Sequence, residues 1–168
     1  MKTIPLTQGK VAIVDDYDYE WLQQWKWHFA VPKPWFGSGK GYARRHQLQP
    51  KKQNIYMHRE ILRRVGEKEF LHTDHINRNP LDNRRINLRP ATRGANLINR
   101  PPDCNNTTGF KGVTLHRIKG RSDKWRARIR VQGVLKSLGL FSALVEAAKV
   151  YNEAAFEYFG DFAYLNEV

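Results

Sequence analysis

Apolar and polar positions alternate in short runs over the first 60 residues, which predicts a small mixed layer of strands and helices. Lys10 to Val14 reads as a strand, and the acidic residues that follow can start a helix reaching Trp25. Further strands are expected at 27–31, 41–45 and 54–57, a Pro- and Gly-rich loop at 32–41, and a helical turn at 58–62. The pattern therefore predicts an N-terminal α/β layer.

Residues 70–100 predict a β-hairpin followed by a helix. The first strand spans 70–76, a connection rich in turn formers fills 77–83, and the second strand spans 86–89. Thr92 is expected to cap a helix that carries Asn96 and Asn99 on one face, because these two lie three residues apart. The helix would then cross the hairpin.

Residues 109–168 predict three strands and one helix. Strict alternation over 125–131 places apolar side chains on one face and Arg126, Arg128 and Arg130 on the other. The other strands are expected at 110–116 and 134–141, and Ser142 is expected to cap a helix that ends at Gly160. The apolar stripe of that helix should cover the apolar sheet face and leave the arginines outward.

A boundary is expected where two prolines precede a polar stretch. Residues 101–108 therefore predict a linker between a domain at 1–100 and a domain at 109–168. The fold class that follows is α+β: an α/β layer leading into a hairpin–helix unit whose core spans 56–100, then a three-stranded antiparallel sheet with one helix.

The charge balance favours a polyanionic partner. The chain has 29 Lys and Arg against 16 Asp and Glu, a formal net charge of +13 at pH 7. Such an excess attracts nucleic acid and supplies phosphate contacts. A solubilising surface or a membrane-surface binder are the alternatives, but the arginines lie in predicted structured segments with aromatic residues between them, which favours nucleic acid.

Other features of the composition favour a reducing compartment. One cysteine, Cys104, leaves no internal disulfide and no Cys-rich zinc site, so no structural zinc is expected. No run is apolar enough to span a membrane, and the first residues lack a signal-peptide pattern. We therefore expect a cytoplasmic protein with no membrane partner and no small-molecule cofactor.

Candidate chemistry is concentrated where a carboxylate and an imidazole are adjacent, at Asp74 and His75, with Asn87 and Asn96 downstream. A carboxylate and an amide can ligate a hard cation, and an imidazole can act as a general base for water. Those are the groups that a one-metal nuclease needs. The alternative is a surface Asp-His pair in a hairpin with asparagines as turn residues.

The stretch Asp74-His75-Ile76-Asn77 … Leu81-Asp82-Asn83-Arg84-Arg85 … Asn87-Leu88-Arg89 … Thr92-Arg93 … Asn96 resembles the HNH family of ββα-metal endonucleases, particularly phage-encoded and homing versions. The resemblance implies that His75 is the general base. It implies that Asp74 and Asn96, with Asn99 as the alternative to Asn96, hold one Mg²⁺ or Mn²⁺ ion. It also implies that Asn87 ties the hairpin loop together and helps to orient His75.

Supporting residues are expected around this motif. His58 either packs against the site or touches a phosphate, and Arg93 is a further supporting candidate. Basic residues along the motif are expected to grip backbone phosphates or stabilise the leaving group, although some could form a solvated face: Arg84, Arg85, Arg89, Arg93 and Arg100.

The C-terminal module resembles an AP2/ERF DNA-binding domain through Gly112-Val113, Trp125 … Ile129-Arg130, Leu138-Gly139-Leu140-Phe141, Ala147-Ala148 … Tyr151-Asn152 and Leu165-Asn166. The resemblance implies double-stranded DNA contacts from Arg128 and Arg130, with Arg126, Lys111 and His116 as further candidates. Thr114, Leu135 and Ser137 depart from the arginines and tryptophan of plant members, so base readout is expected to be looser.

The sequence thus predicts a phage- or homing-like DNA endonuclease, located in the bacterial host cytoplasm if phage-encoded, that nicks as a monomer. Two alternatives remain open: a DNA-binding regulator with a relic nuclease motif, and a structure-specific nuclease. The oligomeric state is not specified by the sequence.

Overall fold

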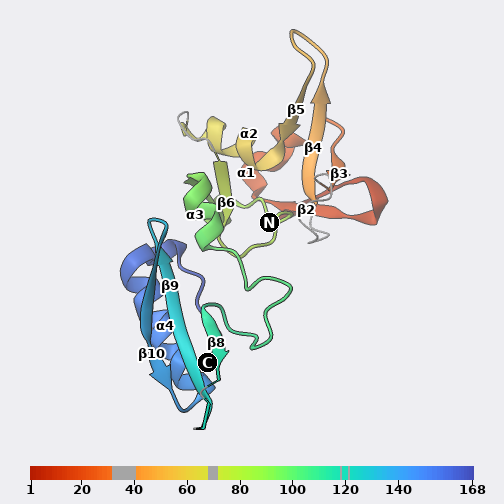
Figure 1. Ribbon diagram of the computed structural model, residues 1–168. Coiled ribbons are helices and arrows are strands. Elements are labelled where there is room, and N and C mark those ends of the chain that lie inside the picture. Colours follow the sequence, from red (N-terminus) through yellow and green to blue (C-terminus); the bar gives the residue numbers. More distant parts are fainter. Residues whose placement is uncertain (32–40, 68–71, 118, 121) are drawn as a thin grey trace. The chain divides into compact units, whose positions relative to one another are not determined.

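The computed structural model describes residues 1–31, 41–67, 72–117, 119–120 and 122–168. The chain divides into two compact units, Met1–Asn96 and Leu97–Val168. Across the described ranges the strands form four small antiparallel sheets, accompanied by four α-helices (Figure 1). This architecture agrees with the expected α+β class. No helix in those ranges has both the length and the apolar character needed to cross a membrane.

The first unit begins with a two-stranded sheet. Strand β1 (Lys2–Pro5) pairs antiparallel with β2 (Val11–Val14) across the 3-10 turn η1 (Thr7–Gly9), and β1 is an element that the sequence pattern did not predict. Helix α1 (Asp16–Leu22) follows and ends before the expected Trp25. It ends there because the Leu22 carbonyl accepts hydrogen bonds from the Trp25 amide and from the Trp27 indole, at 3.3 and 2.8 Å.

A three-stranded sheet and a helix complete the N-terminal layer. Strands β3 (His28–Ala30), β4 (Tyr42–Gln47) and β5 (Gln53–Tyr56) pair in that order, and α2 (Met57–Arg64) follows directly. The expected loop at 32–41 lies, apart from residue 41, outside the described residues. The buried core of this unit includes Leu22, Trp27, Met57 and Ile61.

The hairpin–helix segment lies at the end of the first unit, and the last two residues of its helix belong to the second. Strand β6 (His72–His75) pairs antiparallel with β7 (Leu88–Ala91), and α3 (Arg93–Ile98) follows, which gives the order ββα (Figure 1). The strand expected at 70–76 ends at residue 75, and residues 70–71 lie outside the described part. The return strand starts at 88 rather than 86, because the 3-10 turn η2 (Arg85–Asn87) occupies the preceding positions.

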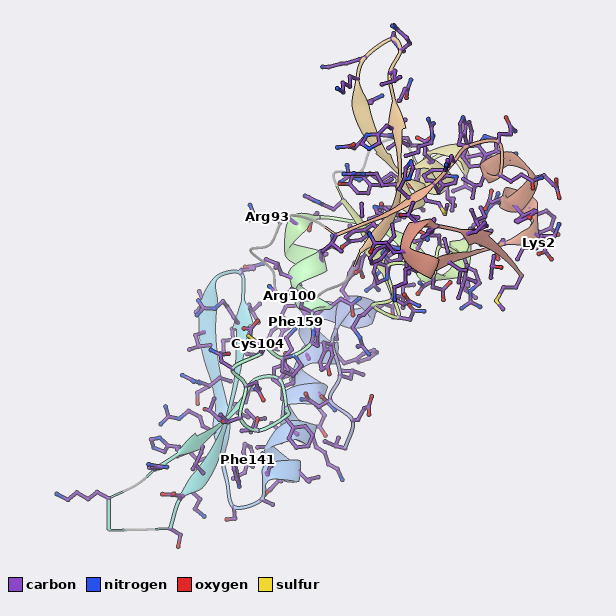
Figure 2. The ribbon with its side chains drawn as sticks, turned by 90° about the vertical axis from the view of Figure 1, so that its right-hand side faces the viewer. Lys2, Arg93, Arg100, Cys104, Phe141 and Phe159 are labelled. Carbon is purple, nitrogen blue, oxygen red and sulfur yellow. The ribbon has the colours of Figure 1, made fainter. Side chains whose placement is uncertain are left out.

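The second unit contains a three-stranded sheet under one long helix. Strands β8 (Val113–His116), β9 (Lys124–Val131) and β10 (Val134–Phe141) pair in the order β10-β9-β8, and α4 (Leu144–Phe159) lies across one face (Figure 1). A short turn, η3 (Gly160–Phe162), follows. Phe141 and Phe159 pack at opposite ends of the core between sheet and helix (Figure 2).

Two details of this unit differ from the sequence pattern. Ser142 does not cap α4: the N-cap is Ala143, without a side-chain hydrogen bond, and the Ser142 hydroxyl accepts a bond from the Lys124 ammonium at 2.7 Å. Strand β8 starts three residues later than expected, because the preceding residues form a loop held by Asn106, whose side-chain oxygen accepts from the Thr108 and Gly109 amides at 3.1 and 2.7 Å.

Candidate active site

The carboxylate and imidazole singled out by the sequence lie at the end of β6. The β6–β7 register places Asp74 opposite Arg89 and His75 opposite Leu88. Both Asp74 and His75 are buried. The hairpin therefore withdraws two titratable groups from water side by side, which is costly unless they are paired.

Arg89 forms an ion pair with Asp74. Its Nε and one terminal nitrogen donate to Asp74 Oδ2 at 2.8 and 2.6 Å. The two side chains are 14% and 9% exposed. The cross-strand position explains the contact, because directly opposed residues of an antiparallel pair point to the same face.

His75 is enclosed by aromatic rings and one amide. Its ring packs edge-on against His58, with centroids 5.1 Å apart, and lies 6.2 Å from the Tyr42 ring. Its Nε2 lies 3.4 Å from Asn83 Oδ1. Burial lowers the pKa of His75 below its ordinary value of 6.5, although the hydrogen bond with Asn83 and the nearby charge of Asp74 act in the opposite direction. Burial therefore favours the neutral form of this imidazole.

His58 forms part of the wall around His75. It follows the first residue of α2, stacks on Tyr56 with ring centroids 5.6 Å apart, and contacts Tyr42 at 5.4 Å. Burial, followed by the neighbouring charges of His75 and Arg59, holds the pKa of His58 well below 6.5. Its Nδ1 is buried without a hydrogen-bond partner. His58 thus contributes an uncharged aromatic surface to the site.

The loop between β6 and β7 is tied by asparagine and aspartate side chains. Asn87 Oδ1 accepts from the Asn77 amide at 2.8 Å, and Asn87 Nδ2 donates to the Asp82 carbonyl at 2.7 Å. Asp82 in turn accepts from Asn77 and from Arg84. The Arg84 guanidinium holds the pKa of Asp82 below its usual value. The orienting role expected for Asn87 stays a prediction.

This loop is also docked on the N-terminal sheet. The Ile13 amide donates to the Leu81 carbonyl and the Asn83 amide donates to the Ile13 carbonyl, each at 2.8 Å, so the loop pairs with β2 as a short parallel bridge. Arg85 adds a second anchor, because its guanidinium binds the fully buried Asp18 at 2.7 and 2.8 Å. The first 18 residues therefore brace the loop beside His75.

Helix α3 brings Asn96 next to β6. Thr92 caps the helix through its hydroxyl, which accepts from the Ala95 amide at 3.1 Å. The Asn96 side-chain nitrogen donates to the carbonyl of Thr73, one residue before Asp74, at 3.4 Å. Arg93 is exposed at the start of the helix, whereas Asn99 is buried and belongs to the second unit.

The oxygen donors near β6 suit a hard cation that retains water. Among the residues the structure describes, no three His, Cys, Asp or Glu side chains gather as a metal-binding cluster. Asp74 offers a carboxylate, and Asn96, bonded beside it, offers an amide whose oxygen differs from the nitrogen engaged with Thr73. One carboxylate and one amide match the few protein ligands that Mg²⁺ takes alongside waters and phosphate oxygens. Asp74 and Asn96 are therefore the residues that could hold a divalent cation here.

Several residues expected to grip phosphates also form ion pairs within the fold. Arg84, Arg85 and Arg89 bind Asp82, Asp18 and Asp74 respectively. Each of these guanidinium groups therefore helps to hold the first unit together.

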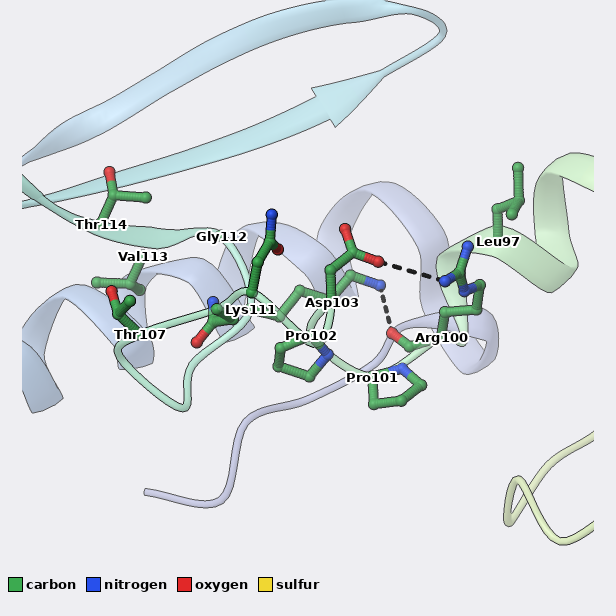
Figure 3. Close-up of a pocket in the computed structure, with 12 residues that line it drawn as sticks. Leu97, Arg100, Pro101, Pro102, Asp103, Thr107, Lys111, Gly112, Val113 and Thr114 are labelled. Carbon is green, nitrogen blue, oxygen red and sulfur yellow. Dashed lines mark hydrogen bonds and ion pairs between the residues drawn. The ribbon is translucent and has the colours of Figure 1, made fainter. Parts of the chain in front are cut away.

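The two basic candidates at the start of the second unit are also engaged within the fold, one by an ion pair and one by backbone carbonyls. Arg100 binds Asp103 at 3.2 Å, and the Lys111 ammonium donates to the carbonyls of Ile98 and Arg100 at 2.6 and 2.7 Å. Arg100, Asp103 and Lys111 line a cavity of about 490 Å³ in that unit (Figure 3).

The outer face of the second sheet carries the expected row of arginines. The register pairs Arg126 with Leu140, Arg128 with Ser137 and Arg130 with Leu135, so these side chains share the face opposite α4. Arg126 contacts both ring nitrogens of His116, and Arg130 donates to the Gly133 carbonyl at 2.8 Å. Arg128, Arg130 and Leu135 line a hollow of about 320 Å³.

Two residues of the site were not singled out by the sequence. Tyr42 is the first residue of β4 and contacts His75 and His58 through tertiary packing, so no local signal could identify it. Asn83 looked like one turn former among several. The adjacent Asp82 and Arg84 gave no sign that the intervening asparagine would be fully buried against His75.

Comparisons with known proteins give one similarity to a viral protein. The chain is 28% identical over 146 residues to a protein of Acanthamoeba polyphaga mimivirus named an uncharacterized HNH endonuclease, covering 85% of this chain and 72% of the relative. No family model matches the chain, and no solved structure matches it. The similarity supports a relation to the HNH nucleases. It gives no support for an AP2/ERF-like second unit.

Proposed function

We propose that this chain is a metal-dependent DNA endonuclease of the HNH type, of the phage or homing kind. Two observations support the proposal: the similarity to the mimivirus protein and the chemistry at the end of β6. The observation that carries it is the buried His75, which lies against His58 and Tyr42 and is adjacent to the Asp74 carboxylate. An Asp-His pair on the surface would be solvated. Burial of these two titratable groups costs free energy, and a role in catalysis explains why the fold retains them.

His75 accepts the proton of the attacking water in this proposal. A general base works best when it is unprotonated at the working pH, and burial lowers the pKa of His75 in the direction that favours this form. His58 and Tyr42 enclose the imidazole with uncharged rings. They restrict its motion and limit competing water.

Asp74 and Asn96 would hold one divalent cation, Mg²⁺ or Mn²⁺. When bound, such an ion supplies Lewis-acid stabilisation of the charge that develops on the scissile phosphate. Arg89 already holds Asp74 at 2.6 Å, so it orients the carboxylate and adds a positive charge beside the phosphate position. Asn87 keeps the loop closed through its two backbone hydrogen bonds.

The arginine face of the second sheet would position double-stranded DNA, in the manner of an AP2-like module. Arg126, Arg128 and Arg130 lie in a row on one strand, and a formal charge of +13 favours a polyanion. Phosphate contacts supply affinity and register, so a small catalytic unit need not read much sequence. One catalytic unit per chain nicks one strand at a time.

The test is cleavage of supercoiled plasmid with Mg²⁺, with EDTA, and with two histidine variants. His75→Ala is expected to abolish conversion to open-circle DNA, with at least about a 100-fold loss of rate because the general base is removed. His46→Ala is the matched control, since His46 is exposed on β4, and it is expected to cleave like the wild type.

The contrary outcomes separate the rival functions. Cleavage by His75→Ala at the wild-type rate would contradict the assignment of the base. Tight binding with no cleavage in Mg²⁺ or Mn²⁺, across several DNA sources, would favour a regulator with a relic nuclease motif. Preference for branched over linear DNA would favour a structure-specific nuclease.

A further inference from the structure

The side-chain amide of Asn83 is buried, and its nitrogen makes no hydrogen bond that would stabilise the fold. The residue is fully buried, at 0% exposure, and its Nδ2 has no hydrogen-bond partner. A buried donor without a partner forfeits its bonds to water, so an apolar residue of similar size would be the more stable choice. The backbone bond from the Asn83 amide to the Ile13 carbonyl does not depend on the side chain.

The remaining half of the amide points at the imidazole of His75. Asn83 Oδ1 lies 3.4 Å from His75 Nε2, at the long end of the hydrogen-bond range, as is common for catalytic hydrogen bonds without substrate. An amide oxygen can only accept, so the contact requires the proton on Nε2. The neutral ring then has its basic lone pair on Nδ1.

The platform that carries Asn83 is fixed on both sides. On one side, Ile13 of β2 bonds both Leu81 and Asn83 through its backbone. On the other, Asn87 fastens the loop to the backbone of Asn77 and Asp82. Asn87 therefore shapes the loop, and Asn83 is the loop residue whose side chain reaches the ring.

We propose that Asn83 is the positioning residue for His75, fixing its orientation and holding the Nε2–H tautomer so that Nδ1 takes the proton from water. This deepens the proposed function and rests on it, because the role matters only if His75 is the general base. It also assigns the orienting contact to Asn83 rather than to Asn87.

The tautomer can be measured directly in the intact protein. Long-range ¹H–¹⁵N spectra of the ¹⁵N-histidine-labelled chain at about pH 8, where an imidazole of ordinary pKa is neutral, distinguish Nε2–H from Nδ1–H. His75→Ala identifies the His75 signals. We expect the wild-type ring to carry its proton on Nε2. A proton on Nδ1 would overturn the proposal, whether or not the protein cleaves DNA.

Two substitutions at Asn83 complete the test. Asn83→Leu removes the acceptor, so the His75 signals should shift toward a mixture of tautomers, while the exposed His46 reports any general change in fold. Asn83→Asp keeps an acceptor oxygen and should retain the Nε2–H form, and it serves if the leucine variant does not fold. Unchanged His75 signals in Asn83→Leu would refute a positioning role.

Kinetics distinguish this proposal from the proposed function. If the wild type cleaves DNA, Asn83→Leu should lower kcat by about 100-fold with little change in KM, as expected for misplacement of a catalytic group. Asn83→Asp should have a kcat between those of the leucine variant and the wild type. A wild-type rate for Asn83→Leu would overturn the positioning role alone. Absence of plasmid cleavage by the wild type would overturn the proposed function, while the tautomer measurement would still stand.

Discussion

At the scale of single residues, the pairing of Asp74 with Arg89 determines how a carboxylate can be kept inside the first unit. Both side chains are largely buried, and the guanidinium donates twice to one carboxylate oxygen. A buried charge that loses its partner remains desolvated, which costs more than the pair itself contributes. Arg89 is therefore structural as well as a candidate contact for phosphate.

Arg89→Gln tests this dependence. Removal of the guanidinium takes the ion-pair partner away from the buried Asp74, so the free energy of unfolding is expected to fall by about 3 kcal/mol. The matched control is Arg63→Gln, because Arg63 pairs with Glu60 but is 59% exposed, and such a pair contributes little. Urea unfolding of both variants gives the comparison. Equal free energies of unfolding for Arg89→Gln and Arg63→Gln would contradict the structural role of Arg89.

The sequence could place Asp74, His75 and Asn96 in one motif, since adjacency and spacing are visible in a linear chain. It could not reveal that Arg89 faces Asp74, because a cross-strand partner depends on the register of β6 against β7. It also could not reveal Asn83 or Tyr42, whose contacts with His75 arise from tertiary packing alone.

At the scale of elements, packing between β8, β9 and α4 depends on a glycine. Gly112 has φ of +76°, and its carbonyl accepts the Arg128 amide at 2.8 Å. A Cβ at this position would overlap the Tyr151 ring and lie 2.6 Å from the Arg128 carbonyl oxygen. The backbone thus approaches both the helix and the middle strand at a distance that only glycine permits.

Gly112→Ala should consequently destabilise the second unit by about 3 kcal/mol, from the left-handed backbone together with the steric overlap. Gly133→Ala is the control, because Gly133 has a φ of +83° but open space around its Cβ position, and it should cost about 1 kcal/mol. Thermal unfolding followed by far-UV circular dichroism measures the difference. Equal destabilisation by the two substitutions would show that the close packing around Gly112 is unimportant.

Elements with a regular pattern were predicted well, and those fixed by distant contacts were not. Strict alternation marked β9, whose bounds differ by one residue from those expected, and the bounds of β10 are those expected. Strand β1 was missed: a four-residue strand containing Pro5 has no clear local pattern, and its partner β2 makes it a strand. Helix α1 is an exception: it stops early because the Leu22 carbonyl accepts from the nearby Trp25 amide and Trp27 indole, a local contact that the apolar pattern did not show.

At the scale of the whole molecule, the charge of +13 is the property that a DNA partner would experience first. Part of that charge is already balanced by ion pairs within the fold, as at Arg84, Arg85 and Arg89. The arginines of β9 are different, because Arg126 bonds the His116 ring and Arg130 bonds a backbone carbonyl. This face is where we expect salt-dependent binding to originate.

Replacement of both Arg128 and Arg130 by alanine should weaken DNA binding and flatten its dependence on salt. Removal of one phosphate contact reduces the steepness of log K against log salt by about 0.9. Lys136→Met is the control, since the Lys136 ammonium binds the Tyr158 hydroxyl on α4 rather than lying on the arginine face. Fluorescence anisotropy at several KCl concentrations gives the slope of log K against log salt for the double variant and for the control. Binding identical to that of the control would exclude this face as the DNA surface.

The bracing of the β6–β7 loop by the start of the chain also has a consequence for how the protein is made. The bonds from Arg85 to Asp15 and Asp18 join residues 70 and 67 positions apart. Contacts of such long range must wait until the whole intervening segment has left the ribosome, and closing so long a loop is entropically unfavourable until its partners arrive. Assembly around His75 is therefore a late event in folding, and an incomplete nascent chain would carry no finished site.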